Sequence, residues 1–139
     1  MTRLILDTCA VIELITSSDA TELEFWDVLD APDTMVYASF ETARELVVLF
    51  NKKKLLSKYW QTAEQMLTSI EQDYYIEFLP LRRDTAFTYS RLQINEAQDH
   101  FDPSDHVIIA HAITEKLTLL SSDHKFSFYR SQGIDLIEY

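Results

Sequence analysis

Glycine is almost absent from this 139-residue chain: Gly133 is the single example, and the chain has only three prolines. All-β sandwiches and barrels need many tight turns, which glycine and proline usually supply. A chain with so few of them suits helices joined by brief connections. Hydrophobic residues make up 47% of the sequence, so the chain can build a packed core and we expect it to be folded.

The length predicts one domain that covers residues 1–139. The single cysteine, Cys9, permits no intramolecular disulfide, which is typical of proteins in a reducing cytoplasm. The first residues lack the basic and apolar segments of a signal peptide, and no apolar run approaches membrane-spanning length. We therefore expect a cytoplasmic protein that has no membrane association.

The formal net charge of −11 bears on the partners of the protein. An acidic total argues against strong non-specific binding to nucleic acid and would suit a basic protein partner. Bound cations would cancel part of this charge. The basic residues are also clustered, at Lys52–Lys54 with Lys58 and at Arg82 with Arg83, so net charge alone leaves the partner open.

Short apolar runs alternate along the chain with longer segments of helical periodicity. We expect strands over residues 3–6, 35–38, 76–79, 117–120 and 134–137. We expect helices over residues 8–16, 19–29, 39–53, 57–74, 85–97 and 103–116. Strands separated by helices pair in parallel through right-handed crossovers. The predicted fold class is a three-layer α/β/α domain with a mainly parallel sheet of about five strands.

Two aspartates lie at the ends of predicted strands. Asp7 closes the first apolar run and Asp123 closes the last strongly apolar one. Ligands of open α/β sheets bind outside the carboxyl ends of the strands, which is where both side chains are expected. An aspartate between a strand and a helix is also a favoured N-cap, so for each residue both interpretations stay open.

Further acids lie on predicted helices. In the Asp-Pro-Ser-Asp segment at 102–105, Asp102 suits the N-cap of a helix and Asp105 suits its first turn, where acids are stabilising. The same geometry would point the Asp105 side chain into the crevice, so a functional role is also compatible with the pattern. Glu41 and Glu45 share one helical face. We interpret Glu41 as a solvated first-turn acid. Glu45 lies at the border of the buried face, so a surface position and a functional role both stay open for it.

Carboxylates that meet in one pocket repel each other, so a protein that gathers them usually binds a cation there. Hard divalent cations prefer carboxylate oxygens. If the predicted fold brings Asp7, Glu45, Asp105 and Asp123 together, these four acids predict a divalent-metal site.

The order of these acids on this framework resembles the PIN-domain nucleases, in particular the VapC-type toxins of bacterial toxin–antitoxin pairs. Four segments carry the resemblance: the opening Asp-Thr of residues 6–12, the Ser-x5-Glu-Leu helix from Ser39 to Leu46, the Asp-Pro-x-Asp helix start of residues 102–110, and the hydroxyl-x-Asp followed by Phe in residues 119–126. Each segment is weakly specific, but their shared order and spacing make a strong match over almost the whole chain.

The resemblance implies a metal-dependent endoribonuclease in which the acids matching Asp7, Glu45, Asp105 and Asp123 hold one or two Mg²⁺ or Mn²⁺ ions. Thr8 and Ser121 could supply hydroxyls that orient these carboxylates. Asp102 is a possible extra metal ligand, although a role as the helix N-cap is enough to explain its position. The implied partners are an RNA substrate, a second copy of the chain in a homodimer, and a cognate antitoxin whose extended arm crosses the active site.

Other residues have candidate secondary roles. The candidates for contacts with RNA phosphates are Lys52, Lys53, Lys54, Lys58, Arg82 and Arg83; for at least half of them we favour an ordinary solvated position. Cys9 is interpreted as a small buried hydrophobe and His124 as solvent-exposed. His106 and His111 are five positions apart, do not share a helical face, and make a poor zinc pair.

Three other functions compete with the nuclease. A catalytically inactive PIN-like scaffold that only binds protein is the main alternative, and the intact set of four acids argues against it. A phosphatase of the haloacid-dehalogenase type needs an aspartate two residues after the first one, where this chain has Cys9. Response-regulator receivers need adjacent N-terminal acids, which are missing here.

Overall fold

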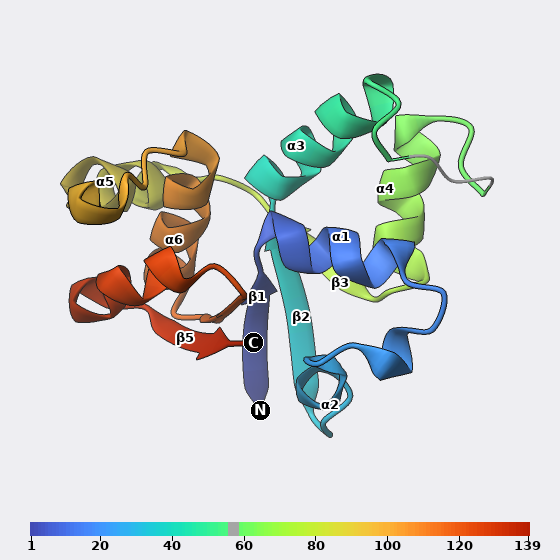
Figure 1. Cartoon of the computed structure of the whole chain (residues 1–139), viewed down its shortest axis with the longest axis horizontal. Coiled ribbons are helices and arrows are strands. Elements are labelled where there is room, and N and C mark those ends of the chain that lie inside the picture. The colour runs from blue at the N-terminus through green and yellow to red at the C-terminus, as the bar shows by residue number, and fades with distance from the viewer. Residues whose placement is uncertain (56–58) are drawn as a thin grey trace.

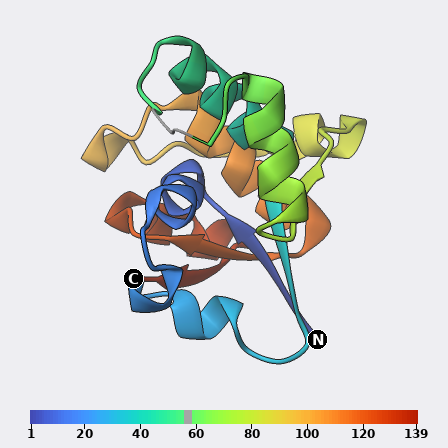
Figure 2. The ribbon, with the colours of Figure 1, turned by 90° about the vertical axis from the view of Figure 1, so that its right-hand side faces the viewer.

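A computed structural model describes residues 1–55 and 59–139 and contains a parallel five-stranded sheet in the order β3-β2-β1-β4-β5 (Figure 1). The strands are β1 (Thr2–Leu6), β2 (Thr34–Ser39), β3 (Ile76–Leu79), β4 (Thr118–Ser121) and β5 (Asp135–Glu138). Every neighbouring pair is parallel. Figure 2 shows β1 and β2 running side by side away from the N-terminus.

Helices connect and cover these strands. The α-helices are α1 (Thr8–Thr16), α2 (Trp26–Leu29), α3 (Phe40–Asn51), α4 (Ala63–Gln72), α5 (Arg83–Arg91) and α6 (Pro103–Glu115). Shorter 3₁₀ helices are η1 (Ala20–Glu22), η2 (Glu96–Gln98) and η3 (His124–Gln132). In Figure 1, α1, α3 and α4 lie to one side of β1, and α5 and α6 lie to the other. The predicted three-layer α/β/α fold is confirmed.

The central strand β1 is buried on both faces, which explains its continuous apolar run. Leu6 packs with α1, α3 and α4 in one core cluster. Ile5 packs with α6 and η3 in the other. Neighbouring residues of a strand point to opposite faces, so one short strand contributes to both cores. Both side chains are fully buried.

The predicted strands and the helices at residues 8–16, 39–53 and 103–116 are confirmed with small shifts at their ends. Three helical predictions were wrong in extent, and side-chain caps explain two of the differences. The segment after Asp19 divides into η1 and α2. Helix α4 begins after the capping residue Thr62, and the predicted start at residue 57 lies outside the described residues. Helix α5 ends at Arg91, and Asn95 caps the separate η2.

The chain order of the strands positions the site. From β1 the connections run first to β2 and β3 and later to β4 and β5, so the order switches between β1 and β4. A crevice forms at the carboxyl ends of strands at such a switch point. Asp7 follows β1 and Asp123 follows β4, and both residues therefore lie at the crevice.

Within the described part of the chain, no helix combines the length and apolarity that crossing a bilayer requires.

Candidate active site

Asp7 is fixed by two elements at the switch point. Its Oδ1 accepts the Ala10 N–H at 2.8 Å, which caps α1, and its Oδ2 accepts the Ser121 hydroxyl at 2.5 Å. The residue is only 4% exposed. Burial raises its pKa to about 6, and the negative charges of Glu13 and Asp123 act in the same direction. Asp7 is therefore a helix cap and also a buried carboxylate whose charged form is destabilised.

Asp123 is held by the same hydroxyl. Its N–H donates to Ser121 Oγ at 3.1 Å, and its Oδ1 accepts the Lys125 N–H at 2.9 Å, which caps η3. Ser121 thus joins the backbone of one acid to the carboxylate of another across β1 and β4. The hydroxyl that was expected to orient a carboxylate does contact Asp7.

Glu45 projects from α3 toward α1. The Thr8 hydroxyl donates to Glu45 Oε1 at 2.6 Å and lies 3.0 Å from the Thr42 hydroxyl. Glu45 is half-buried. Burial raises its pKa, and the negative charges of Asp102, Asp105 and Glu41 add to the effect. Thr8 is therefore hydrogen-bonded to the carboxylate that it was expected to orient.

Asp105 occupies the first turn of α6, where Oδ2 lies 2.9 Å from Nε2 of His100. Its side chain is 23% exposed. Burial raises its pKa to about 7, and the next contributions come from the negative charges of Asp102, Asp7 and Asp123. Asp102 itself is exposed and caps α6 through the Ser104 N–H at 2.9 Å. Asp102 thus acts here as a cap that adds negative charge.

The four predicted acids converge electrostatically at one edge of the sheet. Asp105 feels the charges of Asp7 and Asp123, and Glu45 feels that of Asp105. Ligand atoms of His100, Asp105 and Asp123 all lie within 4.8 Å of one another. Carboxylates that are destabilised by burial and by each other's charge would be stabilised by a cation. The residues present therefore fit a divalent metal ion, with oxygen as the main ligand atom.

Glu41 corrects one interpretation of the sequence. It was expected to be a solvated acid, but its side chain is only 13% exposed. It pairs with Arg44 and accepts the Ser104 hydroxyl at 2.8 Å. The hydrogen bond from Arg44 is the main reason that its pKa is lowered. Glu41 thus ties α3 to the start of α6, which fixes the helix that carries Asp105.

Cys9 was also misassigned, since it is exposed and not buried in the core. The neighbouring residues Ala10 and Val11 are the ones that α1 turns toward the core. Partial burial raises the pKa of the Cys9 thiol to about 11, and the charges of Asp7 and Asp105 contribute. The thiol is therefore protonated at neutral pH and is not an activated nucleophile.

The histidines fall into different environments. His124 is exposed, as predicted. His106 is buried, and its Nε2 lies 2.8 Å from the carbonyl oxygen of His100. His100 is the residue that the sequence analysis missed: it lies in the loop before α6, and no local pattern connects it to Asp105. Its orientation also depends on Tyr129, 29 residues away in the chain, so a folded structure was needed to find it.

The candidate RNA contacts lie at the carboxyl end of α3 and the amino end of α5. Lys52, Lys53 and Lys54 are exposed at the carboxyl end of α3, whereas Ser39 caps its other end at the crevice. Arg82 and Arg83 are exposed at the start of α5, and the Arg83 guanidinium lies 4.7 Å from the centre of the Phe87 ring. The prediction for Lys58 falls outside the described residues.

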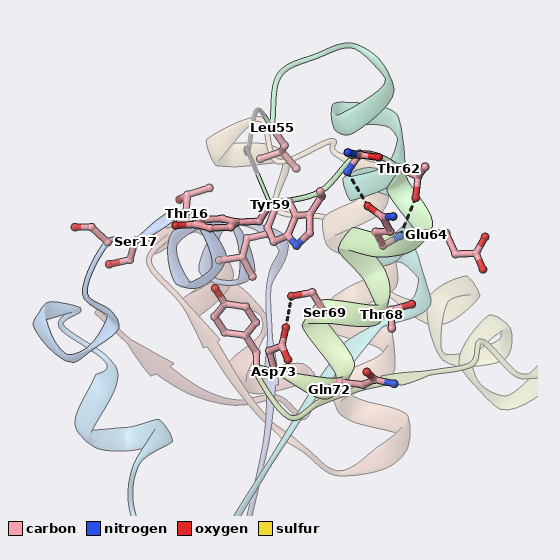
Figure 3. Close-up of a pocket in the computed structure, with 16 residues that line it drawn as sticks. Thr16, Ser17, Leu55, Tyr59, Thr62, Glu64, Thr68, Ser69, Gln72 and Asp73 are labelled. Atoms are coloured by element: carbon pink, nitrogen blue, oxygen red, sulfur yellow. Dashed lines mark hydrogen bonds between the residues drawn. The ribbon is translucent and has the colours of Figure 1, made fainter.

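A wide groove of about 1580 Å³ lies between the end of α1 and α4 (Figure 3). Hydroxyl and amide side chains dominate its lining, and the Ser69 hydroxyl donates to Asp73 at 2.8 Å. None of the four converging acids lines this groove. It therefore offers a surface for contacts but lacks the carboxylate cluster.

Comparisons with known proteins agree with this architecture. The model of the PIN domain family matches residues 4–130. A chain in a structure of VapBC2 from Rickettsia felis bound to a promoter DNA fragment is similar, with 20% identity and a TM-score of 0.75 over 99% of this chain and 98% of that one. A chain in the DNA-bound VapBC structure from Salmonella typhimurium has 20% identity and a TM-score of 0.68 over 99% and 98%.

A chain of VapBC-5 from Mycobacterium tuberculosis has 22% identity and a TM-score of 0.65 over the full length of both chains. None of the curated proteins matches the sequence. Because these identities are low, the structural likenesses establish the fold, and the family model adds the sequence relationship.

Proposed function

Because the chain belongs to the PIN-domain family of nucleases, we propose that it is a metal-dependent endoribonuclease, the toxin of a VapC-type toxin–antitoxin pair. The observation that carries this proposal is the convergence of Asp7, Glu45, Asp105 and Asp123 at the switch point of the sheet. A chain that needed these acids only as caps would have no reason to place them within reach of one another's charge.

The four acids would hold one or two Mg²⁺ or Mn²⁺ ions. When bound, such ions supply acidification of an attacking water and neutralisation of charge at the scissile phosphate. Hydroxyl groups of the chain itself orient these carboxylates. Ser121 donates to Asp7 and Thr8 donates to Glu45, so each anion is oriented before a ligand arrives. Hydrogen bonds of this kind tune both the position and the basicity of metal ligands.

The net charge of −11 would repel RNA, which is also negatively charged. We propose that some of the basic residues at the ends of α3 and α5 contact phosphates, namely Lys52, Lys53, Lys54, Arg82 and Arg83, with Lys58 a further candidate from sequence alone. Each neutralised phosphate adds salt-sensitive affinity. Changing Lys52, Lys53 and Lys54 to alanine should flatten the salt dependence of cleavage, and an unchanged slope would remove these lysines from the proposal.

The proposed partners follow from the same likeness. Several similar solved structures are VapBC toxin–antitoxin complexes, which supports a cognate antitoxin for this chain. We propose that a basic, arginine-bearing segment of that antitoxin covers the acidic crevice, that the toxin is a homodimer, and that both act in the cytoplasm. Binding of the segment should weaken as salt rises, because the attraction between exposed charges is screened.

Calorimetric titration of the partner-free protein with Mn²⁺ tests the proposal without knowledge of the RNA. We expect saturable binding in the wild type and at least about tenfold weaker binding in Asp105→Asn. Asp84→Asn is a matched control, because Asp84 is also an acid in the first turn of a helix, α5, but is exposed. Equal binding by wild type and Asp105→Asn, or no binding, would favour the alternative of an inactive protein-binding scaffold.

A further inference from the structure

The imidazole of His100 is held at both nitrogens although the residue is only 3% exposed. Nδ1 lies 3.0 Å from the Tyr129 hydroxyl oxygen, and Nε2 lies 2.9 Å from Asp105 Oδ2. A buried ring bonded on both edges has one orientation and one arrangement of protons that satisfies its partners. That arrangement can be deduced from the neighbouring groups.

The proton on Tyr129 decides the tautomer of His100. The Asn95 N–H donates to the Tyr129 oxygen at 3.1 Å, so the hydroxyl accepts on that side and its own hydrogen points elsewhere. Donation to His100 Nδ1 satisfies it. Neutral imidazole carries a single N–H, which must then be on Nε2 and must donate to the Asp105 carboxylate. The opposite tautomer would leave the hydroxyl hydrogen without an acceptor among the described residues. It would also set a lone pair against Asp105 in its ionised form, the form that binds a cation.

Packing prevents the ring from turning away. The ring of Phe126 lies 5.2 Å from that of His100, and the ring of Tyr129 lies 5.5 Å from it, measured between centroids. The backbone of His100 is fixed as well, because its N–H donates to the Asn95 carbonyl at 3.0 Å. The Asn95 amide in turn donates to the Lys125 carbonyl at 3.2 Å. The loop before α6 is thus bound to η3, the helix that Asp123 caps.

We propose that His100 is a positioning residue of the metal site: its Nε2–H holds Oδ2 of Asp105 so that Oδ1 would remain available to a cation, and Tyr129 fixes the tautomer that makes this possible. The proposal rests on the metal-dependent function proposed above. It assigns a chemical task to two residues that lie outside the four acids. The competing arrangement is direct ligation of the cation by Nε2, since His100, Asp105 and Asp123 offer ligand atoms within 4.8 Å of one another.

Substitutions at His100 separate the two arrangements. The amide nitrogen of glutamine can replace the donor at Nε2, so Mn²⁺ affinity in His100→Gln should stay within about threefold of wild type. His100→Leu keeps the ring's approximate volume but removes the donor, and its affinity should fall about 10- to 100-fold, as is usual for groups that orient metal ligands. Tyr129→Phe removes only the hydroxyl, and its affinity should fall between these two.

Pulsed electron paramagnetic resonance of the bound Mn²⁺ gives an independent readout. We expect no coupling from a directly coordinated nitrogen in the wild type, because Nε2 carries a proton. A nitrogen coupling that disappears in His100→Gln would overturn the proposal in favour of direct ligation, as would equal losses of affinity in His100→Gln and His100→Leu. Wild-type affinity in both His100→Leu and Tyr129→Phe would show that the network is only structural.

The controls keep this test apart from that of the proposed function. If wild type binds Mn²⁺ and Asp105→Asn does not, the proposed metal site is supported regardless of the results for the His100 variants. If wild type fails to bind Mn²⁺, both proposals fall. Circular dichroism checks the fold of each variant, and if His100→Leu does not fold, the comparison of His100→Gln and Tyr129→Phe with wild type still decides the outcome.

Discussion

The amino end of helix α6 and the position of His111, farther along the same helix, differ in whether their buried polar groups have hydrogen-bond partners. At the amino end, Ser104 bonds to Glu41, Asp105 contacts His100, and His106 contacts a carbonyl oxygen. Farther along the same helix His111 is fully buried, and neither of its ring nitrogens has a hydrogen-bond partner among the described residues. The polar groups at both positions are buried or partly buried in the same layer, so burial alone does not distinguish the amino end of α6 from His111.

The difference teaches which buried polar groups organise a site. A buried polar group with partners has a fixed position, whereas one without them only incurs the desolvation penalty. Burial lowers the pKa of His111, which keeps the ring neutral. Changes at the amino end of α6 should therefore affect the chemistry of the site, and changes at His111 should affect only the free energy of unfolding.

The largest expected effect is the loss of RNA cleavage in Asp105→Asn. The asparagine carbonyl can still accept a hydrogen bond from His100, so the fold should survive while one carboxylate charge is lost. We expect cleavage in the presence of Mn²⁺ to fall by about 100-fold or more. His111→Leu, on the same helix, should cleave like wild type. Equal losses in the two variants would show that α6 acts through its stability and not through Asp105.

The second prediction concerns the stability of the metal-free protein. Because the folded-state pKa of Asp105 is about 7, above its ordinary 3.8, the folded state binds this proton more tightly than the unfolded state. The resulting stability is complete at low pH and is lost as pH rises through about 7. The free energy of unfolding of the wild type, measured relative to that of Asp105→Asn, should therefore increase by about 1 kcal/mol from pH 8 to pH 6.5.

The comparison with Asp105→Asn is needed because other groups titrate in the same pH window. The pKa values of His100, His106 and His111 are lowered, mainly by burial, so protonation of these residues in the unfolded state opposes the gain from Asp105 between pH 8 and pH 6.5, in the wild type and in the variant alike. Urea titrations at pH 8 and 6.5 measure the change. Asp105→Asn should lack this gain, so it should be about 1–2 kcal/mol more stable than wild type at pH 8 and exceed the wild type by less at pH 6.5. A variant less stable than wild type at pH 8 would contradict this account.

The sequence predicted the parts of the site that depend on local order. Asp7 and Asp123 follow apolar runs, and Asp105 follows a proline at the start of a helix, so strand and helix patterns place them at one edge of the sheet. Glu45 needed the resemblance to the PIN family as well, because its helical position fitted a surface residue equally well. The helix boundaries that failed depended on caps such as Thr62 and Asn95, which compete with periodicity.

The parts that the sequence could not predict depend on distant contacts. His100 meets Tyr129, 29 residues away, and Glu41 meets Ser104, 63 residues away. No window of the chain contains both partners of either pair. Cys9 faces the acids because α1 turns Ala10 and Val11 toward the core. Hydrophobic type alone suggested the opposite, since a cysteine next to apolar residues fits a core position equally well.

The smallest expected effect is a gain of stability in His111→Leu. The substitution removes two buried nitrogens without partners among the described residues and retains an apolar side chain of similar size. We expect the free energy of unfolding to rise by about 1 kcal/mol in urea titrations at pH 8, with unchanged Mn²⁺ affinity. The matched control is Thr114→Val on the same helix, because the Thr114 hydroxyl lies 2.8 Å from the Thr88 hydroxyl. That variant should lose about 1 kcal/mol. If both variants were destabilised, His111 would have a partner that satisfies it, and the contrast between the amino end of α6 and His111 would no longer hold.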